Sequence, residues 1–171
     1  MTTVNGMDVE GLKGYIEGIR QDRSKADRHP VVVAHWEGNS RARVEAEGRK
    51  GFYLGGDDDF SACHALLGAL AACDVEVVAT HAALIGVEIE ELRVEASGAF
   101  NIASLLGVDS PTDAAYESIS YKVVIDAPDA SQDQIAQLEH ACERFSPVGD
   151  SLRKAIPLTL EFASKGRAVR A

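Results

Sequence analysis

The chain has 171 residues, of which 46% are hydrophobic and 26% are charged, a composition typical of one ordinary globular domain. Its formal net charge is −10 at pH 7, and its sequence pI is about 4.9. Because nucleic acids and anionic membrane surfaces are bound by clustered lysine and arginine, we expect neither as a partner.

The first predicted element is an amphipathic helix that ends near Asp27, before the break at His29 and Pro30. Its apolar side chains recur at helical spacing between polar ones, at Leu12, Tyr15, Ile16 and Ile19. We therefore interpret residues 1–28 as an N-terminal helical arm, 29–165 as the main domain and 166–171 as a polar tail.

Three short runs rich in β-branched and aromatic residues follow, separated by glycine-containing turn signals, at 31–37, 41–47 and 50–54. Short strands joined by tight turns predict an antiparallel meander. The acidic run 57–59 comes next, and we interpret it as a capping feature because a helix N-terminus favours negative charge.

The segment 60–86 organises the rest of the chain. No charged residue occurs between Phe60 and Cys73, and the apolar residues face every direction of a helix. Such a helix must be buried all round, so it is predicted to be the central helix. Its apolar part before Asp74 is about 14 residues, short of the roughly 20 needed to span a bilayer.

The second half of the chain alternates between strands and a helix. Ser131 is predicted to cap a helix whose apolar face carries Ile135, Leu138, Cys142 and Phe145, and which stops at Pro147. The remaining segments are predicted as a strand (87–96), a long connection (98–115), a strand (116–126), a short basic turn (148–155) and a final strand (157–163).

This order of elements predicts an α+β fold with antiparallel strands. One sheet covers only one side of the central helix, so we expect a second subunit to cover the other side, in a homodimer. The absence of a signal peptide and the sparse cysteines are typical of a reducing compartment, and we expect a cytoplasmic protein.

Several motifs carry a family resemblance. The glycines before the helix, the run ALLGALAAC that ends at Cys73, the strand VEIEELRVEASG and the segment IDAPDASQDQIAQLEHACERFSPVGDSL resemble the OsmC/Ohr family over about residues 30–163. The resemblance implies an OsmC-like fold, with antiparallel sheets wrapped around long central helices in an intertwined homodimer. It also implies reduction of organic hydroperoxides by a pair of cysteines.

The chain departs from that peroxidase pattern at two positions. Cys73 matches the first cysteine of the family, but Ser146 stands at the second, in SPV instead of CPV. Cys63 stands where Ohr-type members carry a carboxylate. The family arginine that assists the thiolate comes from the N-terminal strand region, where Arg41 and Arg43 are the candidates.

Cys73 has two interpretations. A thiol attacks peroxide only as the thiolate, and Asp74 and Glu76 lie beside it in sequence, so a guanidinium must come from elsewhere in the chain. The sulfenic acid that forms must then be resolved by a thiol, for which Cys142 is the hypothesis. Alternatively, Cys73 and Cys142 are small buried hydrophobic residues, the usual role of a free cysteine.

No cofactor is predicted. Cys63 neighbours His64, and His140 lies two residues from Cys142, but residues one or two apart on a helix do not face each other. No CxxC or HExxH motif occurs, so we expect no metal. The remaining candidates are a thiol-dependent hydroperoxide reductase with an external thiol reductant, a non-enzymatic dimer that binds a small apolar ligand at the subunit interface, and a structural stress protein.

Overall fold

The structure is a computed structural model that describes residues 2–109, 113–154 and 156–162. It opens with a small hairpin, a helix and a 3₁₀ turn: β1 (Thr3–Val4), β2 (Met7–Asp8), α1 (Val9–Gln21) and η1 (Arg23–Ala26). The predicted amphipathic helix is confirmed, but α1 ends at Gln21 and only the tighter η1 reaches Ala26. The sequence prediction missed the hairpin.

The N-terminal segment is attached to the far end of the central helix. The Asn5 side chain donates a hydrogen bond to the carbonyl of Val87 (2.9 Å) and accepts one from the backbone N–H of Ile89 (3.0 Å). The Asp8 side chain caps α1 by accepting from the N–H of Gly11. One short polar turn therefore holds the start of the chain against residues more than 80 positions away.

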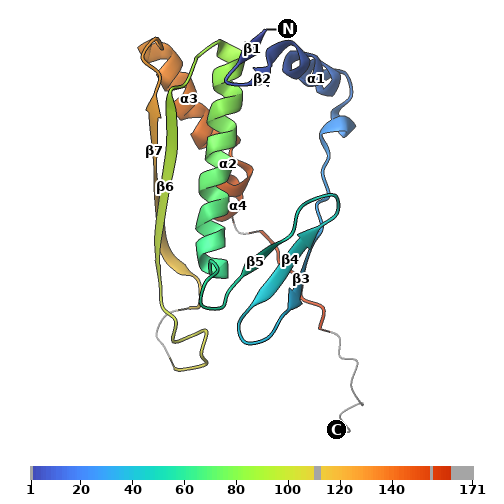
Figure 1. The fold of residues 1–171 in the computed structure, drawn as a ribbon, viewed down its shortest axis with the longest axis vertical. Helices are drawn as coiled ribbons and strands as arrows, with labels where there is room; N and C mark the ends of the chain where they lie inside the picture. The colour runs from blue at the N-terminus through green and yellow to red at the C-terminus, as the bar shows by residue number, and fades with distance from the viewer. Residues whose placement is uncertain (1, 110–112, 155, 163–171) are drawn as a thin grey trace.

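The meander is confirmed as an antiparallel sheet of β3 (Val32–Trp36), β4 (Ala42–Ala46) and β5 (Phe52–Leu54), in the order β3-β4-β5. Its strands contact chiefly one another, and Figure 1 shows the sheet standing beside the lower half of α2 rather than wrapping it. Val44 is the one buried residue of these three strands.

The central helix is α2 (Ala62–Ile85). Ser61 caps its start by accepting a hydrogen bond from the N–H of His64, so the acidic run is not the cap as predicted. Instead, Asp59 pairs with Arg41. The helix ends at Gly86, whose φ of 74° is left-handed and favours glycine.

Within one chain, burial of α2 is one-sided, so the burial all round that the sequence predicts stays a prediction that depends on a second copy. Its buried residues form one stripe with Ala83 beside it: Leu70, Asp74, Val78 and Ala82. Within one chain, α3, β6 and α4 cover this side and the remaining faces stay at least partly exposed (Figure 1). The second cover that we expected for this helix is therefore not supplied by its own chain.

The helix lies within the predicted segment 60–86, and its apolar character continues beyond Asp74. By length and composition alone it could cross a membrane, with a mean hydropathy of 1.6 over its best window, of which 22% is buried. A buried core helix passes the same test. Asp74 and Glu76 lie in the middle of α2, where charge is costly in a bilayer, so we interpret α2 as a core helix.

A long antiparallel ribbon covers one side of α2. It consists of β6 (Glu91–Phe100) and β7 (Tyr116–Asp126), with Leu92 opposite Ile125 and Ala96 opposite Tyr121. The bounds of β7 are confirmed, whereas β6 begins four residues later and ends four residues later than predicted. Val87 bonds back to Ala82 in the helix cap and is unavailable to the ladder.

Two helices complete the described chain, α3 (Gln132–Phe145) and α4 (Pro147–Arg153). Ser131 and Gln134 form a capping box at the start of α3, as the predicted Ser131 cap implies. The predicted basic turn is wrong: Pro147 occupies the first turn of α4, where its missing N–H costs nothing, and Ser146 caps that helix.

The predicted final strand is not formed. Residues 157–162 pair with no other strand of the described chain, and Ala163 lies outside the described residues. The core lies between α2, α3 and the ribbon, where the buried side chains are Val78, Ala82, Val87, Leu138 and Cys142. The α+β class is confirmed.

Candidate functional site

The site is built around a contact between Cys73 and Ser146. Cys73 lies midway along α2 and is partly exposed, whereas Ser146 is 1% exposed at the junction of α3 and α4. The Ser146 hydroxyl donates a hydrogen bond to the Cys73 sulfur over 3.4 Å. The fold therefore brings together the two positions that the family resemblance pairs, with an oxygen in place of the second sulfur.

Gly149 holds the serine in place. Its backbone N–H donates to the Ser146 Oγ (3.1 Å), in the usual geometry of an N-cap. A Cβ on Gly149 would lie 2.9 Å from that Oγ and 3.5 Å from the Nη1 of Arg153. Only glycine leaves room for the hydroxyl, so this small space is shared by a serine hydroxyl and a guanidinium.

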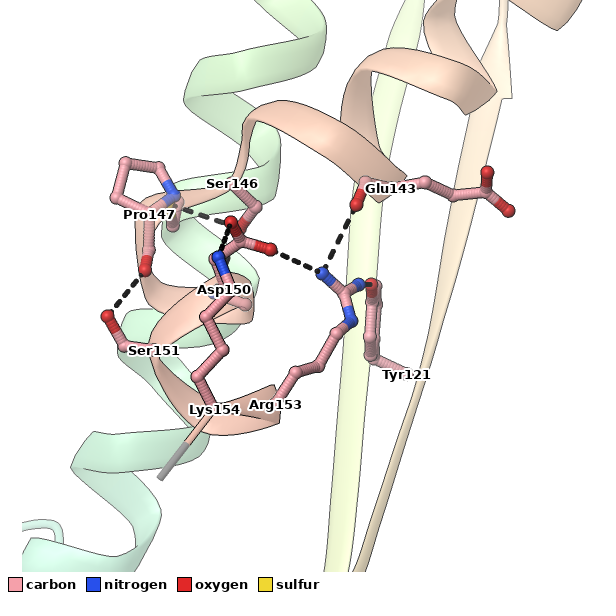
Figure 2. A network of polar contacts seen from close by, with 10 residues as sticks. Tyr121, Glu143, Ser146, Pro147, Asp150, Ser151, Arg153 and Lys154 are labelled. Atoms are coloured by element: carbon pink, nitrogen blue, oxygen red, sulfur yellow. Dashed lines mark hydrogen bonds and ion pairs between the residues drawn. The ribbon is translucent and has the colours of Figure 1, made fainter. Parts of the chain in front are cut away.

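Arg153, in the last turn of α4, is fixed by three acceptors. It donates to the Tyr121 hydroxyl (2.9 Å), to the backbone carbonyl of Glu143 (3.2 Å) and to the carboxylate of Asp150 (3.4 Å). Figure 2 shows its guanidinium between the ribbon on one side and the α3–α4 corner on the other. Lys154 also binds Asp150 (2.8 Å), and this hydrogen bond lowers the pKa of the Asp150 carboxyl.

Asp74 is the unusual residue of this corner. It is 0% exposed, and within the described chain neither of its carboxylate oxygens has a hydrogen-bond partner. Burial is the main cause that raises the pKa of Tyr121 on β7 and of Cys142 on α3. The nearby carboxylate of Asp74 raises both pKa values further. Burying a carboxylate without hydrogen-bond partners costs free energy, so Asp74 lowers the stability of the fold.

Cys142 lies in the hydrophobic core. It is 7% exposed and packs with Val78, Ala82 and Leu138. Burial is the main reason that the pKa of its thiol is raised to about 11. In this environment the sulfur stays protonated at neutral pH. Cys142 therefore fits the alternative that it is a small buried hydrophobic residue.

The two arginines proposed from the sequence lie in the β3–β5 region. Arg41 pairs with Asp59 (2.9 Å) and stacks over the Tyr53 ring (3.9 Å), and Arg43 pairs with Glu37 (2.9 Å) and with Glu45. These hydrogen-bonded carboxylates raise the pKa of both guanidiniums. Within the described chain, these partners of Arg41 and Arg43 belong to the β3–β5 region and to the segment before α2.

Cys63 and the histidines form no metal site among the described residues, where no group of three His, Cys, Asp or Glu side chains has the required geometry. Cys63 lies in the first turn of α2, and its carbonyl accepts a hydrogen bond from the Tyr116 hydroxyl (2.9 Å). Two imidazoles pack on Phe145 instead: His81 stacks at 5.1 Å and His140 meets it edge-on at 6.0 Å.

A groove of about 560 Å³ runs along α2 on the side of the β5 strand. Small residues of the helix form its floor, among them Gly68, Ala69 and Ala72, the last of which precedes Cys73. Phe52 and Phe60 supply aromatic walls. Asp58 and Asp59 also line the groove, which therefore combines a largely apolar surface with two carboxylates.

Sequence reasoning missed Gly149, Arg153 and Tyr121 as parts of this corner. The sequence contains one usable signal, because a serine followed directly by a proline, with an acidic residue in the first turn, is typical of a helix start. Because residues 148–155 were interpreted as a turn, the helix that carries Arg153 was not predicted. Tyr121 comes from the paired ribbon, and its proximity depends on tertiary packing alone.

Comparison with known proteins identifies the family to which this fold belongs. The family model of OsmC-like proteins matches residues 55–161, which is more than half of the chain. The fold defines a protein of the OsmC-like class, with a cysteine of its central helix facing the start of a later helix. The chain belongs to the OsmC-like protein family.

Two solved structures of OsmC-like proteins share the fold at low identity. An OsmC-like protein of Mycoplasma pneumoniae is 17% identical, with a TM-score of 0.63, and the match covers 74% of this chain and 89% of that one. An OsmC-like protein of Vibrio cholerae is 12% identical, with a TM-score of 0.55 and coverages of 73% and 94%. The organic hydroperoxide resistance protein OhrB of Bacillus subtilis is 16% identical, with a TM-score of 0.49 and coverages of 74% and 91%. No curated protein matches the chain significantly.

Proposed function

We propose that this protein is a thiol-dependent reductase of small organic hydroperoxides, with a role in peroxide stress in the cytoplasm. Its nucleophile is Cys73, and its reductant is an external thiol. The observation that carries the proposal is the contact between the partly exposed Cys73 sulfur and the buried Ser146 hydroxyl, 3.4 Å apart. Membership of the OsmC-like family supports it.

The chemistry follows from the reactivity of a thiolate. The Cys73 sulfur attacks the terminal oxygen of the hydroperoxide, a sulfur–oxygen bond forms, and the oxygen–oxygen bond breaks. The alkoxide leaves with the electron pair of that bond, takes a proton from solvent and departs as the alcohol. The sulfur is now a sulfenic acid, and the peroxide has been reduced.

A thiol must return the sulfur to its starting state. Ser146 forms no disulfide, so in this proposal an external thiol attacks the sulfenic acid and releases water, and a second thiol frees Cys73 from the mixed disulfide. The alternative, a displaced resolving role for Cys142, predicts a Cys73–Cys142 bridge after one equivalent of peroxide. Peptide mass spectrometry without added thiol distinguishes the two routes.

We further propose that the active form is a homodimer. The support is the one-sided burial of α2 and a set of large apolar side chains left exposed in one chain, including Trp36 at 79%, Leu158 at 96% and Phe162 at 88%. A second copy would cover these surfaces and complete the shielding of the central helix.

The test is consumption of cumene hydroperoxide with dithiothreitol as reductant. We expect peroxide-dependent turnover in the natural sequence and its loss in Cys73→Ser, with Cys63→Ser as the matched control that retains it. Turnover that survives Cys73→Ser would contradict the proposal.

A second candidate function is favoured by the groove beside Ala72. A non-enzymatic dimer would use it to hold a small apolar ligand, with Cys73 only as part of the lining. In that case the protein consumes no hydroperoxide, yet an apolar fluorescent probe binds it. Substituting Gly68→Leu would fill the groove and abolish that binding.

A further inference from the structure

We propose that the guanidinium of Arg153 on α4 stabilises the negative charge of the alkoxide that departs when Cys73 attacks the peroxide. This inference rests on the proposed function, and it gives that site a cation from a different element than Arg41 and Arg43. The geometry that carries it is the shared space around Gly149.

The first step of the argument is proximity. The Ser146 hydroxyl touches the Cys73 sulfur at 3.4 Å, and the same hydroxyl lies 2.9 Å from the point that a Gly149 Cβ would occupy. The Nη1 of Arg153 lies 3.5 Å from that same point. The Ser146 hydroxyl therefore contacts the Cys73 sulfur, and the same hydroxyl and the Arg153 guanidinium both border the space that a Gly149 side chain would fill.

The second step is rigidity. The guanidinium is held by the Tyr121 hydroxyl, the Glu143 carbonyl and the Asp150 carboxylate, which come from β7, α3 and α4 (Figure 2). A cation fixed before the reaction stabilises developing charge without reorganising, which is the main source of electrostatic catalysis. Ser146 caps the start of α4 and Arg153 is its last residue, so the same short helix fixes the positions of both.

The third step is charge. The corner contains the buried carboxylate of Asp74 beside Cys73, and Asp150 and Glu143 at its edge. When Cys73 attacks, negative charge moves from the sulfur to the alkoxide, in surroundings that are already acidic. A guanidinium at this place offsets that charge, whereas Arg41 and Arg43 each pair with carboxylates of their own sheet region.

The experiment compares two reactions of the same sulfur in Arg153→Met. Cumene hydroperoxide oxidation produces an alkoxide, whereas iodoacetamide alkylation expels iodide and produces none. We expect single-turnover oxidation of Cys73 to slow by about tenfold or more, while its alkylation, followed on the Cys73 peptide, stays within about twofold. Arg144→Met, an exposed arginine in the last turn of α3, is the matched control that leaves both rates unchanged.

The outcomes separate this inference from the proposed function. Tyr121→Phe, which removes one of the groups that position Arg153, should slow oxidation to a smaller extent and spare alkylation. Equal loss of both rates in Arg153→Met would assign Arg153 a structural role and overturn the inference. So would full peroxide activity in Arg153→Met together with a loss in Arg41→Met or Arg43→Met. If even Cys73→Ser keeps turnover, the proposed function itself fails.

Discussion

Asp74 and Cys73 are neighbours in sequence, but their side chains lie in different environments. The carboxylate is fully buried without a hydrogen-bond partner in the described chain, beside a sulfur that is partly exposed. Groups that lower stability in this way are concentrated at functional sites. The sequence showed the acidic neighbours of Cys73, but it gave no sign that one is buried and the other, Glu76, is exposed.

We predict that Asp74→Asn stabilises the fold. Removing an unpaired buried charge should raise the free energy of unfolding by about 1–2 kcal/mol, since the amide is cheaper to bury than a carboxylate. Asp129→Asn makes the same change at an exposed position in the turn before α3 and should change the free energy of unfolding by less than about 0.5 kcal/mol. Urea unfolding measures both, and a loss of stability in Asp74→Asn would mean that the carboxylate has a partner.

Cys142 makes a prediction about pH. The pKa of its thiol in the folded state is about 11, above the unfolded value of 9.0, so between these values the unfolded chain binds fewer protons and stability falls as pH rises. The loss is on the order of 2 kcal/mol across pH 9–11. Cys142→Ala should lower the free energy of unfolding at pH 7 but flatten its dependence on pH between 9 and 11. An unchanged slope in this range would show that Cys142 is not the group that titrates there.

At the scale of elements, agreement between sequence and structure depends on how local the signals are. The bounds of β7 and the start of α3 could be predicted because an alternating run and a capping serine act within a few residues. By contrast, α4 was missed because Pro147 was interpreted as a stop, although it is also a favourable first residue. The start of β6 depends on the helix cap and on Asn5, which is remote in sequence.

We predict that Gly149→Ala destabilises the α3–α4 corner by about 1–2 kcal/mol, because the new Cβ meets the Ser146 side chain. It should also slow peroxide reduction by displacing that hydroxyl from Cys73. Gly14→Ala is the matched control: it lies in the middle of α1 with nothing within 4 Å of the new Cβ, and should stabilise by up to about 1 kcal/mol. Thermal unfolding measures both, and equal effects would remove the special role of Gly149.

At the scale of the whole molecule, the family and the α+β class followed from one apolar helix with Cys73 late in it and from a later Ser-Pro-Val. The composition of α2 also predicts a second cover over this helix, and that cover stays a prediction. What the sequence could not supply is which side of α2 its own chain covers, because residues at 70, 74, 78 and 82 are no more apolar than those on the other faces.

The proposed homodimer predicts the mass of the protein in solution. Light scattering should give twice the chain mass of 18.2 kDa for the natural sequence. Val75 is 36% exposed on α2, and Val75→Arg should give a monomer because it places a charge in the surface that the second copy covers. Gln21→Arg adds the same charge at the exposed end of α1 and should leave the dimer intact. A monomeric natural protein would contradict the proposed assembly.

The most direct test of the account is to trap the oxidised sulfur. The protein is treated with one equivalent of cumene hydroperoxide in the presence of dimedone, a reagent specific for sulfenic acids, and its peptides are analysed by mass spectrometry. The account predicts near-stoichiometric label on Cys73, with little on Cys63 and none on Cys142. Peroxide that remains unconsumed, or label shared equally among the three cysteines, would contradict it.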